Sequence, residues 1–242
     1  MSSCLWRYTR TPLKQLRSPT TQRCQISRTS VVMSSRIIDA IKTDHRELED
    51  YYKKILNSTS EKEKAQWQNQ FTWELARHSI GEELVVYPQF EKNLPDGRAM
   101  AEKDRKEHQS VCRSQSNTFL LLVNNASQVK EQLKKFQNMK PSDPLFQPTI
   151  TALMQDLSEH IKEEESQDLP KLEDALAPEE SENLSRSFGR TKMFVPSRSH
   201  PSAPDKPPFE TAIGLMTAPI DHLADLFRKW PHTSGMPNPS TK

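Results

Sequence analysis

The sequence predicts an all-α protein whose core is an up-down-up-down four-helix bundle. Apolar residues recur at intervals of three and four positions along four stretches of the chain, which is the period of an amphipathic helix. The chain of 242 residues contains only 5 Gly, which argues against a fold built from tight β-hairpins. The connections between the four stretches are mostly short, and short connections favour antiparallel neighbouring helices.

The formal net charge of +2 conceals three segments of different character. Residues 1–38 carry seven Lys or Arg and no acid, whereas residues 39–182 carry 28 acids against 19 Lys or Arg. Residues 183–242 are basic again, and nine of the 18 prolines fall at or after Pro196. We therefore divide the chain into a leader (1–33), a helical domain (34–176) that is long enough to bury a core, and a tail (177–242) whose proline-rich last fifth is expected to be mostly irregular.

The leader is rich in Arg, Ser and Thr and has no acid and no long apolar segment, which is typical of a mitochondrial transit peptide. We expect a mitochondrial protein, or a cytoplasmic one if translation starts at Met33. The basic residues lie in the flanks, so we predict no nucleic-acid partner. Cys112 is the single cysteine of the helical domain, which excludes a disulfide framework. The longest apolar run, residues 119–123, is too short to span a bilayer.

The first helix is expected to begin near residues 34–35, where serines can cap it, and to end at residues 57–59. Ser60 and Glu63 have the spacing of a capping box and predict the start of the second helix. Pro88 should kink that helix or end it nearby, because proline removes a backbone hydrogen bond.

A turn at residues 93–97 precedes the third helix, which is predicted over about 98–139. The fourth helix is expected to begin with Asp143 as cap and Pro144 at its first position. In the tail, residues 219–230 predict a short amphipathic helix. Its apolar face comprises Ile220, Leu223, Ala224, Phe227 and Trp230. We expect this helix to dock on the helical domain, with weak peripheral contact to a membrane or docking on a partner as the alternatives.

The pattern His-x3-Glu-Glu-x4-Pro occurs twice, at residues 78–88 and 160–170. Positions four apart lie on the same face of a helix, so each copy directs an imidazole and a carboxylate to one spot. His45 and His108 fall on the apolar stripes of the first and third helices. All four helices therefore contribute a histidine to the predicted core.

A single buried histidine is most often a hydrogen-bonded core residue, but four on separate stripes, two with a glutamate one turn on, indicate a shared ligand. Buried ionised carboxylates are costly unless they are paired or coordinate a cation. The sequence thus predicts a carboxylate-bridged pair of metal ions, with iron preferred and manganese or zinc as alternatives. The predicted terminal ligands are His45, His78, His108 and His160, and the predicted bridges are Glu82 and Glu164.

Six protein ligands leave open positions on two six-coordinate ions, which water, hydroxide, a diatomic molecule or peroxide can fill. Asp104 and Glu74 are candidates for a further ligand. Glu83 and Glu165 lie about 100° further round their helices, so they are expected to be solvated or to hydrogen-bond to the ligands.

The domain resembles the hemerythrin-like HHE cation-binding family over about residues 35–176. The resemblance is carried by Asp44-His45-Arg46-Glu47-Leu48, by both copies of the repeated motif and by Glu107-His108. It implies a four-helix bundle with a non-heme diiron centre that binds oxygen or responds to it. The iron-sensing F-box branch of the family shares the His-x3-Glu pair on the second and fourth helices.

The chain departs from the oxygen-carrying members of that family. Those proteins have a His-x3-His pair on the third helix, whereas here Asp104 lies one turn before His108 and Cys112 one turn after it. They also have His-x4-Asp on the fourth helix, where this chain has His160 and Glu164. The F-box branch can place a ligating Glu directly after the second-helix His, and here that residue is Ser79.

Three functions are consistent with these patterns. The first is a non-heme diiron protein that binds or senses oxygen, nitric oxide or iron. The second is a diiron oxidase or peroxidase-like enzyme, and the third is a metal-free helical interaction module. The sequence indicates no particular oligomeric state.

Overall fold

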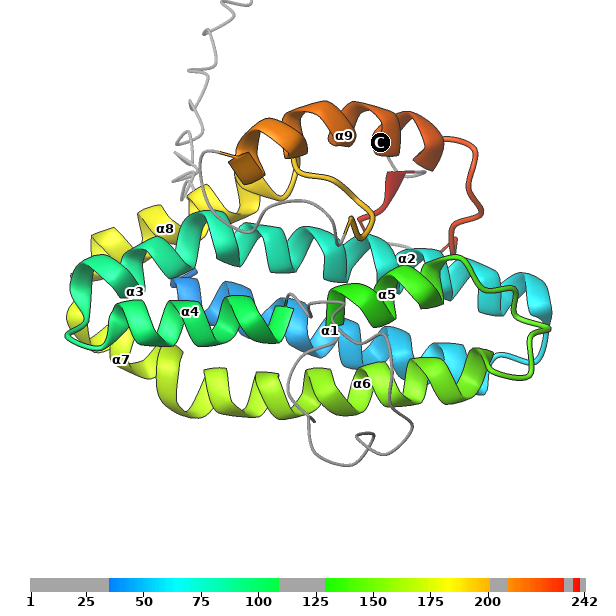
Figure 1. The fold of residues 1–242 in the computed structure, drawn as a ribbon, viewed down its shortest axis with the longest axis horizontal. Helices are drawn as coiled ribbons and strands as arrows, with labels where there is room; N and C mark the ends of the chain where they lie inside the picture. The colour runs from blue at the N-terminus through cyan, green and yellow to red at the C-terminus, as the bar shows by residue number, and fades with distance from the viewer. Residues whose placement is uncertain (1–34, 109–128, 201–208, 233–236, 240–242) are drawn as a thin grey trace, which may run out of the picture. The chain divides into compact units, whose positions relative to one another are not determined.

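A computed structural model of the chain describes residues 35–108, 129–200, 209–232 and 237–239. Regular secondary structure within these ranges is entirely helical (Figure 1), so the all-α class is confirmed. None of the described helices is both long and apolar enough to cross a membrane. The leader and part of the predicted third helix, including Cys112, lie outside the described residues.

Helices α1 (Ile37–Asn57) and α2 (Glu61–Gly81) pack against each other through their apolar faces. α2 begins as predicted, because the Ser60 hydroxyl accepts a hydrogen bond from the Glu63 N–H at 3.2 Å. α1 begins without a side-chain cap. The Ser35 hydroxyl, which was expected to cap it, lies 3.1 Å from the hydroxyl of Ser185 instead.

Each copy of the repeated motif continues its helix through a short π-helical turn. α2 passes into η1 (Glu82–Val86) and α3 (Tyr87–Asn93), and α6 (Phe146–Glu163) passes into η2 (Glu164–Asp168) and α7 (Leu169–Ala175). Pro88 and Pro170 follow these turns and lack the N–H that an α-helix would need there. The wider turn carries the helix past each proline, so Pro88 alters the helix and does not end it.

The four stretches that were predicted as long helices are called rods. Within the third rod the structure describes two helices, α4 (Gly97–His108) and α5 (Val129–Gln137). The helix of the fourth rod begins later than predicted, because α6 starts at Phe146 and Pro144 lies in the preceding turn. Asp143 shapes that turn, since its carboxylate accepts a hydrogen bond from the Leu145 N–H at 2.8 Å.

Two apolar clusters fill the bundle. The first is formed by α1, α2, α5 and α6, with Leu48, Phe71, Phe136, Ile150 and Leu153 among its members. The second is formed mainly by α1, η1, α3, α7 and α8 (Pro178–Thr191), with Ile37, Ile41, Val86, Leu169 and Phe188 among its members.

Several of the predicted ligands lie between these clusters along their helices. On α1, Ile41 belongs to the second cluster and Leu48 to the first, with His45 between them. On the fourth rod, Ile161 belongs to the first cluster and Leu169 to the second, with Glu164 between them. A layer of ionisable groups therefore divides the apolar core.

Residues 178–191, at the start of the predicted tail, form α8, a helix that sequence analysis did not predict. Leu184 and Phe188, one turn apart, are buried in the second cluster. The Ser181 hydroxyl accepts a hydrogen bond from the Ile37 N–H at 3.0 Å and so provides the first turn of α1 with a partner.

The tail helix α9 (Phe209–Asp225) begins and ends earlier than the predicted 219–230. Trp230 lies beyond it and packs on Trp73 of α2, with ring centroids 6.1 Å apart. Ile220, Leu223 and Phe227 were predicted to share a face with Trp230, yet they are exposed. Trp230 is therefore buried against α2, whereas Ile220, Leu223 and Phe227 lie in solvent.

Substitution of two glycines tests how tightly α8 is packed. A Cβ on Gly81 would lie 2.8 Å from the buried ring of Phe188, so Gly81→Ala should cost about 1–3 kcal/mol through overpacking. A Cβ on Gly189 meets nothing within 4 Å, so Gly189→Ala should stabilise by about 0.5–1 kcal/mol through helix propensity. Urea unfolding of the metal-free protein measures both, and equal effects of the two changes would contradict the described packing.

Candidate metal centre

Four histidines from α1, α2, α4 and α6 gather in the layer that divides the core. They are His45, His78, His108 and His160. The rings of the first two have centroids 4.9 Å apart, and the rings of the last two have centroids 5.0 Å apart. All four are buried. The structure therefore brings the predicted imidazole ligands together as two pairs.

Glu82 lies between the two pairs of imidazoles. One carboxylate oxygen, Oε1, is 3.1 Å from Nε2 of His78, and the other, Oε2, is 3.6 Å from Nε2 of His108. Glu164 approaches the first pair from the fourth rod, with Oε2 at 3.4 Å from Nε2 of His45. Each glutamate thus approaches a histidine of a different helix.

Among the described residues, four groups of three His, Asp or Glu side chains are compact enough to hold an ion, and two of these groups contain Glu82. The ligand atoms of His45, His78 and Glu82 lie within 4.8 Å of one another, and so do those of Glu82, His108 and His160. Glu82 is common to both groups. Two adjacent candidate sites therefore share one carboxylate.

The atoms that face this centre have no hydrogen-bond partner among the described residues. They are both oxygens of Glu82, both oxygens of Glu164, and Nε2 of His45, His78 and His160. An unsatisfied buried polar atom costs about 1–3 kcal/mol, so seven in one place need a common partner. A cation satisfies imidazole nitrogens and carboxylate oxygens together, and the residues present therefore fit a metal centre.

The other ring nitrogen, Nδ1, faces a carboxylate in all four histidines. The pairs are His45 with Glu165 at 2.8 Å, His78 with Asp44 at 3.2 Å, His108 with Glu83 at 3.1 Å, and His160 with Glu107 at 2.8 Å. A carboxylate that accepts the Nδ1 proton fixes the tautomer and leaves Nε2 free for a metal. The four rings are therefore oriented toward the centre by four separate acids.

These pairs follow a reciprocal rule that sequence analysis did not find. Glu83 and Glu165, the second glutamates of the repeated motif, orient His108 and His45, the two histidines that lie outside the motif. Asp44 and Glu107, which directly precede those single histidines, orient the histidines of the motif. The acid-His pairs at residues 44–45 and 107–108 were the available sequence signal.

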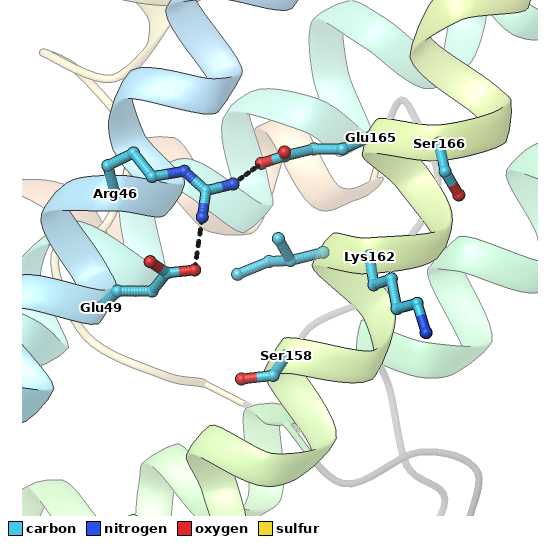
Figure 2. Close-up of a pocket in the computed structure, with 7 residues that line it drawn as sticks. Arg46, Glu49, Ser158, Lys162, Glu165 and Ser166 are labelled. Atoms are coloured by element: carbon cyan, nitrogen blue, oxygen red, sulfur yellow. Dashed lines mark hydrogen bonds and ion pairs between the residues drawn. The ribbon is translucent and has the colours of Figure 1, made fainter.

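Basic side chains lie beside Glu165, Glu107 and Asp44. Arg46 donates to Glu165 at 2.5 Å, Lys103 lies 3.5 Å from Glu107, and Lys192 contacts Asp44. Figure 2 shows Arg46 reaching from α1 to Glu165 across a surface pocket of about 410 Å³. The charge of each supported acid is therefore balanced on the side away from the centre.

Burial and mutual charge shift the ionisation of the central groups. Burial alone lowers the pKa of His78, but the charges of Glu82 and Asp44 outweigh it and raise the pKa to about 10. Burial opposes ionisation of Glu82, yet the charge of His78 lowers its pKa to about 2. For Glu164, burial and the charge of Glu82 both raise the pKa well above its usual range. Burial and mutual charge therefore shift the pKa values of the two glutamates in opposite directions.

The two further ligand candidates occupy different places. Asp104 is buried, its Oδ2 has no partner among the described residues, and a ligand atom lies within 4.8 Å of those of Glu107 and His160. Burial raises its pKa to about 7. Glu74 instead accepts a hydrogen bond from Arg77 at 2.6 Å and another from Lys192. Asp104 thus lies beside the centre, whereas two cations hold Glu74.

Tyr87 is a residue near the centre that sequence analysis missed. It lies just after η1, is fully buried, and its ring centroid is 5.7 Å from that of His108. Its hydroxyl is 3.4 Å from both ring nitrogens of His108. Its position five residues after Glu82, within the repeated motif, was the only signal in the sequence.

The fold, the two imidazole pairs and the shared carboxylate define a helical metal-binding protein of the hemerythrin type. The sequence matches the hemerythrin HHE cation binding domain over residues 36–172, which is more than half of the chain. The protein therefore belongs to the hemerythrin HHE family.

Two curated proteins illustrate the relationship. The chain is 52% identical over 198 residues to an uncharacterized hemerythrin-like protein of Schizosaccharomyces pombe, covering 81% of this chain and 89% of that one. It is 22% identical over 162 residues to a DNA nickase of Nostoc sp., covering 67% of this chain and 40% of that protein. No solved structure matches the chain.

Replacing Glu164 by Met should separate the stability of the protein from its metal binding. The change removes two buried oxygens without partners, so the metal-free protein should gain about 1–3 kcal/mol in free energy of unfolding. Addition of metal should no longer stabilise the variant. Urea unfolding with and without metal measures both effects.

Glu159→Met, at an exposed position of the same helix, is the matched control for that experiment. It should change stability by no more than about 0.5 kcal/mol and preserve stabilisation by metal. A Glu164→Met protein that is less stable without metal would contradict the unsatisfied state of the carboxyl group.

Proposed function

We propose that the protein is a non-heme diiron protein that binds or senses oxygen, nitric oxide or iron. His45, His78, His108 and His160 serve as terminal ligands, and Glu82 and Glu164 bridge the ions. The observation that carries this proposal is the pair of three-residue groups that share Glu82. Iron is the metal proposed, because imidazole and carboxylate ligands from a helical bundle are typical of diiron proteins.

We further propose that the four rods run up-down-up-down. The packing of α1 against α2, of α5 against α6, and of α1 against α6 supports this order. In this arrangement two helical hairpins face each other, and each supplies one His-x3-Glu pair and one single histidine. The reciprocal hydrogen bonds between acids and imidazoles are consistent with this pseudo-twofold relation.

A bound iron pair supplies redox-active, Lewis-acidic positions at which a small molecule can bind. The chain holds that pair between two apolar clusters, which exclude bulk water from the layer. Tyr87 lies over the imidazole of His108, where its hydroxyl is placed to donate a hydrogen bond to a small ligand. The apolar walls and the Tyr87 hydroxyl favour a diatomic molecule over a large polar substrate.

Asp104 distinguishes the two halves of the proposed centre. One turn before His108 the chain has Asp104, whereas one turn before His45 it has Ile41, which is fully buried in an apolar cluster. We propose Asp104 as a further ligand on the side of His108 and His160. The two ions would then have unequal ligand sets.

A diiron oxidase or peroxidase is the second candidate. Asp104 favours it, because a buried acid with an unpartnered oxygen is suited to hold a proton at Oδ2 beside the centre. Turnover of peroxide that is lost in a His78→Ala variant would support this function.

Metal analysis tests the proposed function directly. Protein purified from cells without added metal should contain about two iron ions per chain, as the two ligand groups require. Visible absorption of an oxo-bridged ferric pair should accompany the iron. Less than one iron per chain that does not increase after anaerobic reconstitution would refute the proposal.

Chelation provides a thermodynamic test. Because ions bound only by the folded state stabilise it, a chelator should lower the melting temperature of the wild-type protein. The melting temperature of a His78→Ala variant should respond much less. His232→Ala, which changes an exposed histidine away from the centre, should respond like the wild type. A melting temperature that is unchanged by chelation of the wild type would favour a metal-free helical module.

A further inference from the structure

Helix α8 lies outside the region that matches the hemerythrin HHE domain, yet it packs against a predicted ligand. The ring of Phe188 meets the imidazole of His78 edge to face, with centroids 6.0 Å apart and an interplanar angle of 87°. The close approach requires Gly81, because a Cβ there would lie 2.8 Å from Phe188. α8 therefore contacts the motif between its histidine and its first glutamate.

Lys192 follows α8 directly and enters a buried acidic cluster. Its ammonium group donates hydrogen bonds to Asp44 and to Glu74. Its carbonyl oxygen accepts a hydrogen bond from Arg77 at 3.1 Å. The end of α8 is thus attached to α1 through Asp44 and to α2 through Glu74 and Arg77.

The same oxygen of Asp44, Oδ2, faces both Lys192 and Nδ1 of His78. Asp44, Glu47 and Glu74 lie close together, and their charges repel one another in the absence of a cation. Lys192 supplies a cation between Asp44 and Glu74. It therefore holds Asp44 where Asp44 can accept the Nδ1 proton of His78.

The imidazoles of His45 and His160 have supporting cations of a different origin. The acids that orient them are supported by Arg46 and Lys103, both of which lie within the matched domain. The cation that supports His78 comes instead from the end of α8, beyond that domain.

We infer that α8 and Lys192 form a clamp that orients His78 for metal binding, with Lys192 as a positioning residue that acts through Asp44. The inference rests on the proposed metal-binding function. The clamp makes the metal affinity of the hemerythrin domain depend on a helix outside that domain. Displacement of α8 would release His78 and weaken binding of the ion that His78 holds.

Metal titration of single variants tests the clamp. Lys192→Met should weaken binding of Fe²⁺ or Co²⁺ by about ten- to a hundredfold, as loss of a group that orients a ligand typically does. Lys192→Arg should retain most of the affinity, because it keeps the cation. Arg190→Met, an exposed basic residue two positions away, is the matched control and should bind metal like the wild type.

A double-mutant cycle separates positioning from general destabilisation. Asp44→Asn weakens the contact with Lys192 while keeping an oxygen that can accept from His78. If Lys192 acts through Asp44, Lys192→Met should have little further effect on affinity in the Asp44→Asn background. Equal affinity of wild type and Lys192→Met, or full additivity of the two changes, would overturn the clamp and leave the proposed function intact.

NMR of the metal-free, ¹⁵N-histidine-labelled protein gives a readout that does not depend on metal. The Nδ1–H signal of His78 should be protected from solvent exchange in the wild type and in Arg190→Met, and lost in Lys192→Met. Should Lys192→Met fail to fold, Lys192→Gln replaces it in both experiments, because it keeps a donor without the charge. An unchanged signal would refute the clamp, whereas absence of metal binding by the wild type would refute only the proposed function.

Discussion

The structure depends on placing ionisable groups in the middle of an apolar core. Glu82 and Glu164 are buried with no hydrogen-bond partner among the described residues for any of their oxygens. Apolar clusters lie on both sides of them, so the chain cannot hydrate these carboxylates without opening the bundle. Buried ionisable groups are costly unless an opposite charge or a cation lies beside them. The arrangement of histidines, supporting acids and supporting cations follows from the need to offset that cost.

Around the two glutamates, basic and acidic groups alternate from the centre of the bundle outward. Imidazoles surround the two glutamates, acids hold the far side of each imidazole, and Arg46, Lys103 and Lys192 balance the acids beside them. Each layer fixes the orientation of the one inside it, which suits a site that must bind an ion without rearrangement. The π-helical turns contribute to this order. They begin at Glu82 and Glu164, and such turns are frequent where a helix must re-aim a side chain at a functional site.

Much of this organisation is local and could be predicted. The i to i+4 spacing of His78 and Glu82 places both on one face of a helix whatever that helix packs against. The position of His45 between Ile41 and Leu48 predicts its burial for the same reason. The all-α class and the start of α2 at Ser60 also follow from local patterns, and both were confirmed.

The remainder depends on contacts between distant segments. The pairing of Glu165 with His45 joins residues 120 positions apart, and no periodicity reveals it. The hydrogen bond from Lys192 to Asp44 joins residues 148 positions apart, and Lys192 directly follows α8, a helix that sequence analysis did not predict. The π-helical turns were missed because Pro88 and Pro170 indicate a break, whereas the tertiary packing on both sides favours a wider turn. Asp104 and Ile41 occupy equivalent positions, one turn before His108 and His45 respectively. The difference between them becomes apparent only when the two helical hairpins are compared.

Anomalous diffraction at the iron absorption edge, from crystals of the protein purified without added metal, tests the central claim most directly. The account predicts two peaks about 3.5–4 Å apart, as in other two-metal sites, with Glu82 and Glu164 between the two pairs of imidazoles. No peak within the bundle, or a single ion bound at the surface with the four imidazoles hydrogen-bonded elsewhere, would contradict it.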